Sequence, residues 1–203
     1  RINDAQATPE TVLKGIDAAA AAGLGPIKIN MVVKRGVNDG DVVPMAAHFR
    51  HSGHVLRFIE YMDVGNSNGW NLDEVMTGAE IRAALNQHWP LETVPPRYAG
   101  EVANRCRYRD GGGEVGFINS VSQPFCGGCT RLRLAADGRL YTCLFAHTGF
   151  DLRTLLRGGV TDADLQEQLT RIWGRRADRY SELRTLASAD PDEEKIEMSY
   201  IGG

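Results

Sequence analysis

Three of the four cysteines in this 203-residue chain fall within 18 residues of one another. They follow the spacing C-x2-C-x13-C and are Cys126, Cys129 and Cys143. Four cysteines are too few for a disulfide-stabilised fold of this length, and their clustering is typical of a metal or iron–sulfur site in a reducing compartment. The fourth, Cys106, lies in an arginine-rich segment and is expected to take no part in that site.

The chain around these cysteines favours their convergence. Two glycines separate the first pair and let that segment fold tightly around a bound centre. Asp137-Gly138 predicts a hairpin turn, which brings Cys143 opposite residue 131 or 132 and so close to Cys129. The sequence therefore requires a fold in which three thiolates meet at one place.

Two kinds of metal centre suit three thiolates. A four-iron, four-sulfur cluster would leave one iron without a cysteine ligand, free to take a substrate nitrogen or oxygen. Zinc would need a fourth protein ligand, and His147 is available four residues after Cys143. The spacing alone leaves both centres open.

The first 65 residues alternate between helix and strand signals. A helix is expected to begin at Thr8 as its N-cap and to end at Gly23. Strands are expected at residues 27–33 and 55–62, with a second helix between them. This alternation predicts an α/β fold, either a βα-barrel or a doubly wound sheet.

The strand at 27–33 is expected to have two different faces. Lys28 and Asn30 share one face; the other is apolar and consists of Ile27, Ile29, Met31 and Val33. In a parallel barrel the outer face of a strand meets helices and the inner face can line a site. Lys28 and Asn30 are therefore expected to point inward.

The loop 65–70, rich in glycine and asparagine, predicts a boundary between domains at 1–65 and 66–203. Beyond it, Thr77 and Glu80 form a capping box for a helix. The rest is expected to be α+β: hairpins join 105–109 to 114–121 and 131–135 to 139–144, and helices follow near 151–157 and 161–173.

Arg131 and Arg133 alternate with leucines, so both guanidinium groups are expected on one strand face directly after Cys129. Guanidinium groups bind phosphate oxygens in pairs, so this pattern beside a metal centre suggests a phosphorylated substrate. The alternative is an exposed arginine ladder, which is the interpretation preferred for Arg105, Arg107 and Arg109.

Charge and hydropathy exclude two classes of partner. The net charge of −3 argues against a basic nucleic-acid-binding protein. No apolar run approaches the roughly 18 residues of a membrane-spanning helix, so no membrane partner is expected.

Taken in order, several segments together resemble one family. They are Ile27–Val33, Gly36–Asp39, Arg57–Met62, Phe125–Arg133, Gly138, Cys143-Leu144 and the terminal Gly202-Gly203. The succession is similar to the C-terminal portion of the GTP 3′,8-cyclases of molybdenum cofactor biosynthesis, which are radical S-adenosylmethionine enzymes. The resemblance implies the last βα units of a partial TIM-type barrel, followed by a C-terminal α+β domain whose hairpins carry an auxiliary cluster.

The resemblance also implies residue roles. The three clustered cysteines would bind an auxiliary four-iron, four-sulfur cluster whose open iron contacts the guanine of GTP. The implied GTP-binding residues are Lys28, Arg57, Arg131, Leu132 and Arg133; Arg57 has the weaker support, because its neighbour Phe58 competes for the inward-facing position. The S-adenosylmethionine pocket would be lined by Met62 and Asn30, and the catalytic tail would be Gly202 and Gly203.

One family feature has no counterpart in these 203 residues: the C-x3-C-x2-C motif of the cluster that cleaves S-adenosylmethionine. We therefore expect a fragment that is inactive alone and is completed by the N-terminal half of the same enzyme, which would supply a second four-iron cluster and S-adenosylmethionine. The expected partners are GTP, a second copy in a homodimer, and cyclic pyranopterin monophosphate synthase, which would receive the product. The expected location is the cytoplasm.

Two other functions remain open. One is a different radical enzyme with an auxiliary cluster, acting on a peptide. The other is a zinc module with three cysteine ligands and His147, serving structure or protein contacts; it predicts that His147→Ala releases the metal.

Overall fold

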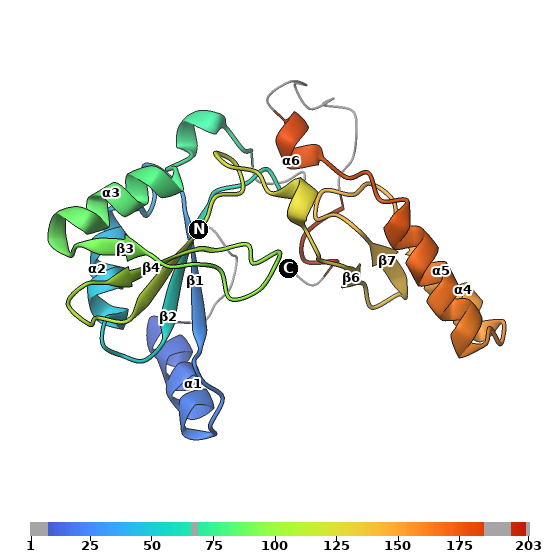
Figure 1. Ribbon diagram of the computed structural model, residues 1–203, viewed down its shortest axis with the longest axis horizontal. Coiled ribbons are helices and arrows are strands. Elements are labelled where there is room, and N and C mark those ends of the chain that lie inside the picture. Colours follow the sequence, from blue (N-terminus) through green and yellow to red (C-terminus); the bar gives the residue numbers. More distant parts are fainter. Residues whose placement is uncertain (1–7, 66–68, 185–195, 202–203) are drawn as a thin grey trace. The chain divides into compact units, whose positions relative to one another are not determined.

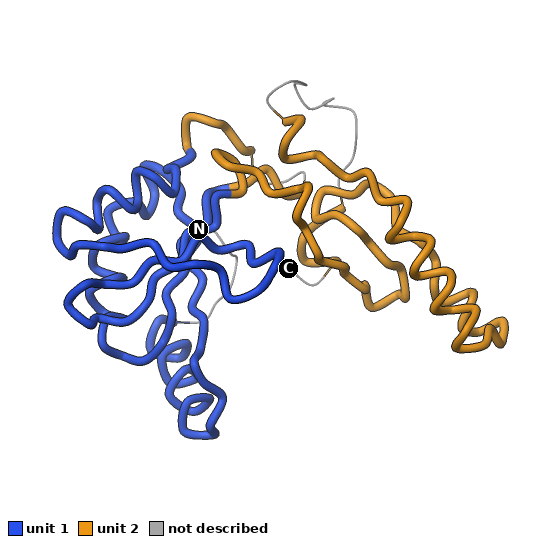
Figure 2. Tube along the Cα trace, viewed as in Figure 1, with its two compact units in different colours: residues 1–61, 75–119 blue, residues 62–74, 120–203 orange. Residues whose placement is uncertain are grey.

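The computed structural model describes residues 8–65, 69–184 and 196–201, which form two compact units. The first unit consists of residues 1–61 and 75–119, and the second of residues 62–74 and 120–203 (Figure 2). Each unit contains helices and strands, which confirms the α/β class. Residues 75–119 lie in the first unit, and the functional division at residue 65 stays a prediction.

The first unit is built on a five-stranded sheet with the order β1-β2-β5-β4-β3 (Figure 1). The parallel strands are β1 (Lys28–Val33), β2 (Val55–Glu60) and β5 (Glu114–Ile118). The sheet continues in antiparallel pairing through β4 (Asn104–Tyr108) and β3 (Leu91–Thr93), so the predicted first hairpin is confirmed. The helices are α1 (Pro9–Ala21), α2 (Val42–Phe49) and α3 (Gly78–His88), with a 3-10 turn η1 (Asp39–Asp41) before α2.

All five strands contribute one face to the core of this unit. Val33, Leu56, Leu91, Tyr108 and Phe117 are buried there, together with side chains of α2 and α3. The opposite face of β1 presents Lys28 and Asn30, which are exposed, so the predicted alternation is confirmed. The sheet therefore has one apolar face covered by helices and one polar face.

Side chains predicted to cap helices do so. Thr8 accepts a hydrogen bond from the backbone N–H of Thr11 at the start of α1 (3.4 Å), and α1 ends two residues before Gly23. Thr77 and Glu80 form the predicted capping box of α3. These contacts satisfy backbone donors that the first helical turn leaves without partners.

The second unit has a three-stranded antiparallel sheet, β6-β7-β8. Its strands are β6 (Arg133–Leu134), β7 (Arg139–Tyr141) and β8 (Phe150–Asp151). The helices are α4 (Leu152–Arg157), α5 (Asp162–Gly174) and α6 (Tyr180–Leu183), and 3-10 turns occur at η2 (Leu72–Glu74) and η3 (Cys126–Gly128). The core cluster of this unit consists of Ala135, Tyr141 and Ile201.

Several predicted strands are longer than the observed ones, and those predicted to end at residues 121 and 144 end at Ile118 and Tyr141. The strand predicted at 55–62 ends at Glu60, whose buried carboxylate accepts the backbone N–H of Gly78 (2.7 Å), so Met62 lies beyond the strand. The hairpin predicted from residue 131 begins at Arg133, because the preceding residues belong to the cysteine loop. No described helix is long and apolar enough to cross a membrane.

Candidate metal and nucleotide sites

The first two cysteines lie at the two ends of a tight turn in the second unit. Cys126 begins η3, and the backbone N–H of Cys129 donates to the carbonyl oxygen of Cys126 (3.2 Å), which closes the turn. The four cysteines of the chain are free thiols, so none is used up in a disulfide. The turn leaves both thiols available as ligands.

The Cys129 thiol lies beside a guanidinium group. Arg131 donates from Nε to Cys129 Sγ (3.3 Å), and its guanidinium lies over the ring of Phe125 (5.1 Å). Burial alone would raise the pKa of this thiol, but hydrogen bonds from Arg131 and the charges of Arg131 and Arg176 outweigh it and lower the pKa. This environment favours the thiolate, the form that binds metals.

Cys143 follows β7 and lies in a more buried environment. Its sulfur accepts the backbone N–H of Phe145 (3.4 Å). Burial raises the pKa of this thiol, and Asp178 and Cys126 act in the same direction, while Arg176 opposes them. Cys126 is thus one of the groups whose charge acts on the Cys143 thiol.

The predicted register of the cysteine hairpin is confirmed. Arg133 pairs with Tyr141 and Leu134 with Leu140, which is the alignment that sets position 131 opposite 143. As placed, the described residues include no group of three or more His, Cys, Asp or Glu side chains close enough to hold one metal ion. Whether the three thiols bind a cluster, and whether His147 contributes, stays a prediction.

Arg133 lies among the same groups. Burial lowers the pKa of its guanidinium, the charge of Arg131 adds to this, and Cys129 and Cys143 act in the opposite direction. Leu132, between the two arginines, is 45% exposed. Arg131 lies before the strand rather than in it, so the two arginines are not both on one strand face as expected. Arg131 contacts Cys129 Sγ, and the charges of Cys129 and Cys143 act on Arg133.

The polar face of the first unit's sheet holds three of the predicted site residues. Asn30 is paired with Arg57 across β1 and β2, and Arg57 donates from Nε to Asn30 Oδ1 (2.9 Å). Lys28, which is exposed, shares this face of β1. Phe58 does not take the place of Arg57: it is 1% exposed and lies in the apolar core on the other face.

A glycine on the neighbouring strand gives Arg57 its space. Gly116 is paired with Arg57, and a Cβ at that position would lie 3.1 Å from Arg57 Cγ. The sequence offered only a weak sign of this role, an isolated glycine within a strand pattern. The absence of a side chain at Gly116 lets the aliphatic part of Arg57 lie along the sheet.

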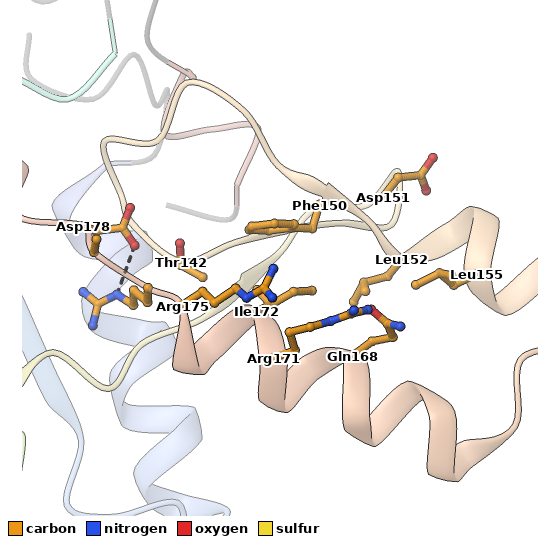
Figure 3. A pocket seen from close by; sticks show the side chains of 12 residues that line it. Thr142, Phe150, Asp151, Leu152, Leu155, Gln168, Arg171, Ile172, Arg175 and Asp178 are labelled. Carbon is orange, nitrogen blue, oxygen red and sulfur yellow. Dashed lines mark hydrogen bonds and ion pairs between the residues drawn. The ribbon is translucent and has the colours of Figure 1, made fainter.

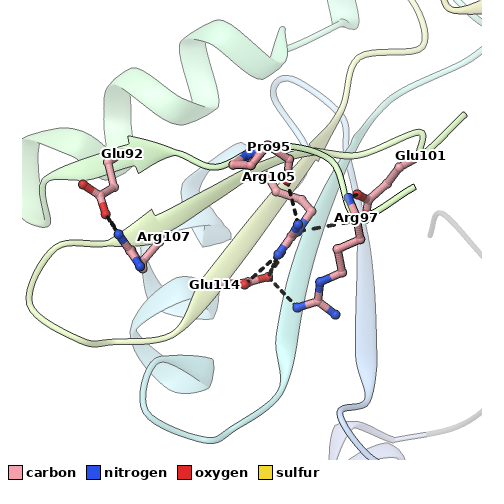
Figure 4. Close-up of polar contacts among 7 residues, drawn as sticks. All are labelled: Glu92, Pro95, Arg97, Glu101, Arg105, Arg107 and Glu114. Atoms are coloured by element: carbon pink, nitrogen blue, oxygen red, sulfur yellow. Dashed lines mark hydrogen bonds and ion pairs between the residues drawn. The ribbon is translucent and has the colours of Figure 1, made fainter. Parts of the chain in front are cut away.

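Further along the same face the arginines are neutralised by carboxylates. Arg105 donates to Glu114 (2.7 Å) and to the carbonyl oxygen of Pro95 (2.8 Å), and Arg97 also pairs with Glu114 (3.1 Å) (Figure 4). The partner of Arg107 is Glu92. The ladder interpretation of Arg105 is therefore wrong, because its side chain is only 12% exposed and holds β4 to β5.

The remaining predicted site residues are Met62, Gly202 and Gly203. Met62 is half-buried in the second unit, in the connection that follows β2. Gly202 and Gly203 lie outside the described residues. Ile201, directly before them, is 2% exposed and packs with Ala135 and Tyr141.

A pocket of about 520 Å³ lies in the second unit, between α5 and the β8–α4 region (Figure 3). Its walls include the apolar side chains of Phe150, Leu152 and Ile172. Arg176 also lines it and donates from Nη1 to the carbonyl oxygen of Cys129 (2.7 Å). Sequence patterns did not single out Arg176, because this contact joins residues 47 positions apart.

Comparisons with known proteins agree with the resemblance. The family described as Molybdenum Cofactor Synthesis C matches residues 54–182. A GTP 3′,8-cyclase from Acidothermus cellulolyticus is 54% identical, over 100% of this chain and 62% of that protein. Enzymes of the same name are 52% identical in Xanthomonas axonopodis pv. citri (95% of this chain, 56% of that protein) and 44% identical in Staphylococcus epidermidis (100% and 60%). The chain therefore spans about three fifths of the length of these relatives.

Proposed function

Because this chain belongs to the Molybdenum Cofactor Synthesis C family, we propose that it is part of a GTP 3′,8-cyclase and binds an auxiliary four-iron, four-sulfur cluster and GTP. The complete reaction would be the radical S-adenosylmethionine-dependent conversion of GTP to 3′,8-cyclo-7,8-dihydro-GTP. Since the chain spans about three fifths of its relatives, that reaction is proposed for the whole protein. This chain alone, without a motif for the S-adenosylmethionine-cleaving cluster, is expected to be inactive.

The observation that carries the proposal is the setting of the three cysteines. All are free thiols, two close one turn, and the third follows the hairpin whose register, if extended, sets it opposite Arg131, two residues after that turn. A donor set of sulfur alone suits an iron–sulfur cluster. When bound, a cluster with one iron not ligated by cysteine would supply a coordination position for a nitrogen or oxygen of the substrate.

The basic residues near this centre suit the phosphates of a nucleotide. Arg131 and Arg133 each present a planar set of donors that matches phosphate oxygens. In the first unit, Lys28 and Arg57 lie on the polar face of the sheet, where Asn30 orients Arg57. We propose that these four residues and Leu132 contact GTP, and that Asn30 and Met62 contact S-adenosylmethionine.

The first unit's sheet suits the wall of a partial TIM-type barrel. Its three adjacent parallel strands have helices on one face, as barrel strands do, and the other face of β1 and β2 presents polar side chains. Under this proposal the polar face is the barrel interior. The tail Gly202-Gly203 would act at the reaction centre.

The proposed compartment and protein partners are those that the family resemblance implies. Four unbridged cysteines suit a reducing compartment, for which we propose the cytoplasm. We also propose a homodimer and transfer of the product to cyclic pyranopterin monophosphate synthase.

Metal analysis of protein purified without oxygen tests the cluster. We expect iron and acid-labile sulfide at about four of each for this site, lost in Cys126→Ala and retained in Cys106→Ala. Stoichiometric zinc without sulfide, released by His147→Ala, would instead establish the zinc module.

Nucleotide binding tests the arginines. The double variant Arg131→Ala/Arg133→Ala is expected to weaken GTP binding by about tenfold or more, since hydrogen bonds to charged groups contribute roughly 1.5–3 kcal/mol each. Arg157→Ala, which changes an exposed arginine at the end of α4, serves as the control. Equal GTP affinity in the double variant and the control, by calorimetry, would refute the assignment of both arginines.

A further inference from the structure

We propose that residues 176–184 (the 176–184 segment) position, for cluster binding, the two loops that carry the three cysteines. The inference rests on the proposed function and adds four positioning residues to it: Arg176, Tyr180, Glu182 and Arg184. None of them is a cluster ligand in this proposal. Each contacts a cysteine backbone or a residue within two positions of a cysteine.

The loop that ends at Cys129 is held by Arg176. The guanidinium donates from Nη1 to the carbonyl oxygen of Cys129 (2.7 Å) and from Nε to Asp178 (3.1 Å), and it lies over the ring of Trp173 (5.1 Å). Its side chain is 12% exposed. With two hydrogen-bond partners and a ring contact, Arg176 has little rotational freedom, so it fixes the position of the Cys129 carbonyl.

The start of the same turn is held by Glu182. Its Oε1 accepts the backbone N–H of Gly127 (3.1 Å), the residue after Cys126. Its other carboxylate oxygen accepts Nε of Arg179 (2.5 Å), which orients the carboxylate. The glycine N–H and the Cys129 carbonyl are thus fixed from outside the turn, at opposite ends of it.

The second loop, which contains Cys143, is held through an aromatic contact. Phe145, whose backbone N–H donates to Cys143 Sγ, stacks on Tyr180 with ring centroids 4.4 Å apart. The guanidinium of Arg184 lies 5.1 Å from the centre of the Phe145 ring. Arg184 and the Tyr180 hydroxyl both bind Asp63, at 2.8 Å and 2.5 Å, and the side chains of Arg184 and Asp63 are almost fully buried.

A physical reason connects these contacts to the cluster. A cluster requires three thiolates at once, and the cysteines come from loops 14 positions apart in the chain, at Cys129 and Cys143. Ordering such loops during binding costs conformational entropy. A segment that fixes both loops beforehand lowers this cost, in the way that outer-shell partners strengthen metal sites by roughly 10- to 100-fold.

The test compares matched variants of the complete protein that contains this chain, purified without oxygen. Glu182→Ala removes the acceptor for Gly127, whereas Glu182→Gln keeps a carbonyl oxygen in its place. Arg176→Met removes the donor to Cys129. The controls are Glu167→Ala and Arg175→Met, which change exposed side chains on or beside α5. The auxiliary cluster is identified as the electron paramagnetic resonance signal that Cys126→Ala abolishes.

We expect iron to leave the auxiliary cluster about 10-fold faster in the presence of a chelator in Glu182→Ala and Arg176→Met. The resonance signal of the reduced cluster should also shift or broaden in these two variants. Glu182→Gln and both controls should behave like the unmodified protein. The cluster-free form of each variant should still unfold in one cooperative transition, so that faster iron release is not caused by loss of the fold.

One experimental result would refute the proposed cluster, and a different result would refute only the positioning role. Unmodified protein without iron and sulfide at this site would refute the proposed cluster. A cluster that is present, but released from Glu182→Ala and Arg176→Met at the rate of the controls with an unchanged signal, would refute the positioning role of the 176–184 segment.

Discussion

Glu80 makes two kinds of stabilising contact at the start of α3. Its carboxylate accepts the backbone N–H of Thr77 (2.8 Å) and pairs with Arg35 (2.7 Å). The Thr77 backbone contact, followed by hydrogen bonds from Arg35 and the Thr77 hydroxyl, lowers the pKa of Glu80 to about 2. Since the folded pKa lies below the unfolded value, the ionised carboxylate stabilises the fold above the unfolded pKa, and this contribution is lost as the pH falls toward 2.

Glu80→Gln should therefore destabilise the protein near neutral pH and lose its effect in acid. The side chain is 46% exposed, so solvent screening limits the ion-pair contribution to the free energy of unfolding to below about 1 kcal/mol. The measurement is the melting temperature of both forms between pH 6 and pH 2.5, with the exposed Glu167→Gln as control. A difference between wild type and Glu80→Gln that stays constant across this range would contradict the pKa assignment.

At the scale of elements, the hairpin that presents the cysteines depends on one glycine. Gly138 has φ +83°, a conformation that glycine adopts easily, and a Cβ there would lie 2.7 Å from the Cβ of Arg153 on α4. Gly159, after α4, has a similar φ of +78° but no atom within 4 Å of such a Cβ. The two glycines therefore share the backbone requirement, and only Gly138 also needs the close approach of a helix.

Gly138→Ala is expected to lower the free energy of unfolding by more than Gly159→Ala. The control should lose about 1 kcal/mol from the left-handed backbone conformation, and Gly138→Ala roughly 1–3 kcal/mol more from the clash. Denaturant unfolding of the two variants measures the difference. Equal losses would show that α4 moves away from the turn at no cost.

Local sequence signals predicted several of these elements. The capping box at Thr77 and Glu80 and the turn at Asp137-Gly138 are chemistry within four residues, and both are confirmed. Strand alternation also placed Lys28 and Asn30 on one face. The division of roles between Arg57 and Phe58 was not predictable, because alternation identifies two faces but not which of them meets the helices.

Contacts between distant segments were not predictable from local patterns. The Arg176–Cys129 contact spans 47 positions, the Glu182–Gly127 contact 55, and the Tyr180–Asp63 contact 117. Each of these side chains would be a typical exposed polar residue on sequence grounds. Tertiary packing alone gives them a role beside the cysteines.

At the scale of the whole molecule, the two units differ in the size of their hydrophobic cores. The core cluster of the first unit contains 13 buried residues among those described, from two helices and five strands. The described core cluster of the second unit contains three, Ala135, Tyr141 and Ile201. A unit with a small core commonly depends on a metal or a disulfide for stability, and the cysteines of this chain are unbridged.

Removal of the proposed cluster should therefore destabilise the two units unequally. If ligand binding by three cysteines adds to the stability of the second unit, chelation should lower amide-hydrogen protection in β6 and β7 more than in β1, β2 and β5. Hydrogen exchange before and after anaerobic chelation measures this, with Cys126→Ala as a metal-free reference and Cys106→Ala as a cluster-retaining control. Equal protection of β6 and β7 with and without metal would show that the second unit folds on its packing alone, because the cluster would then bind a site already formed.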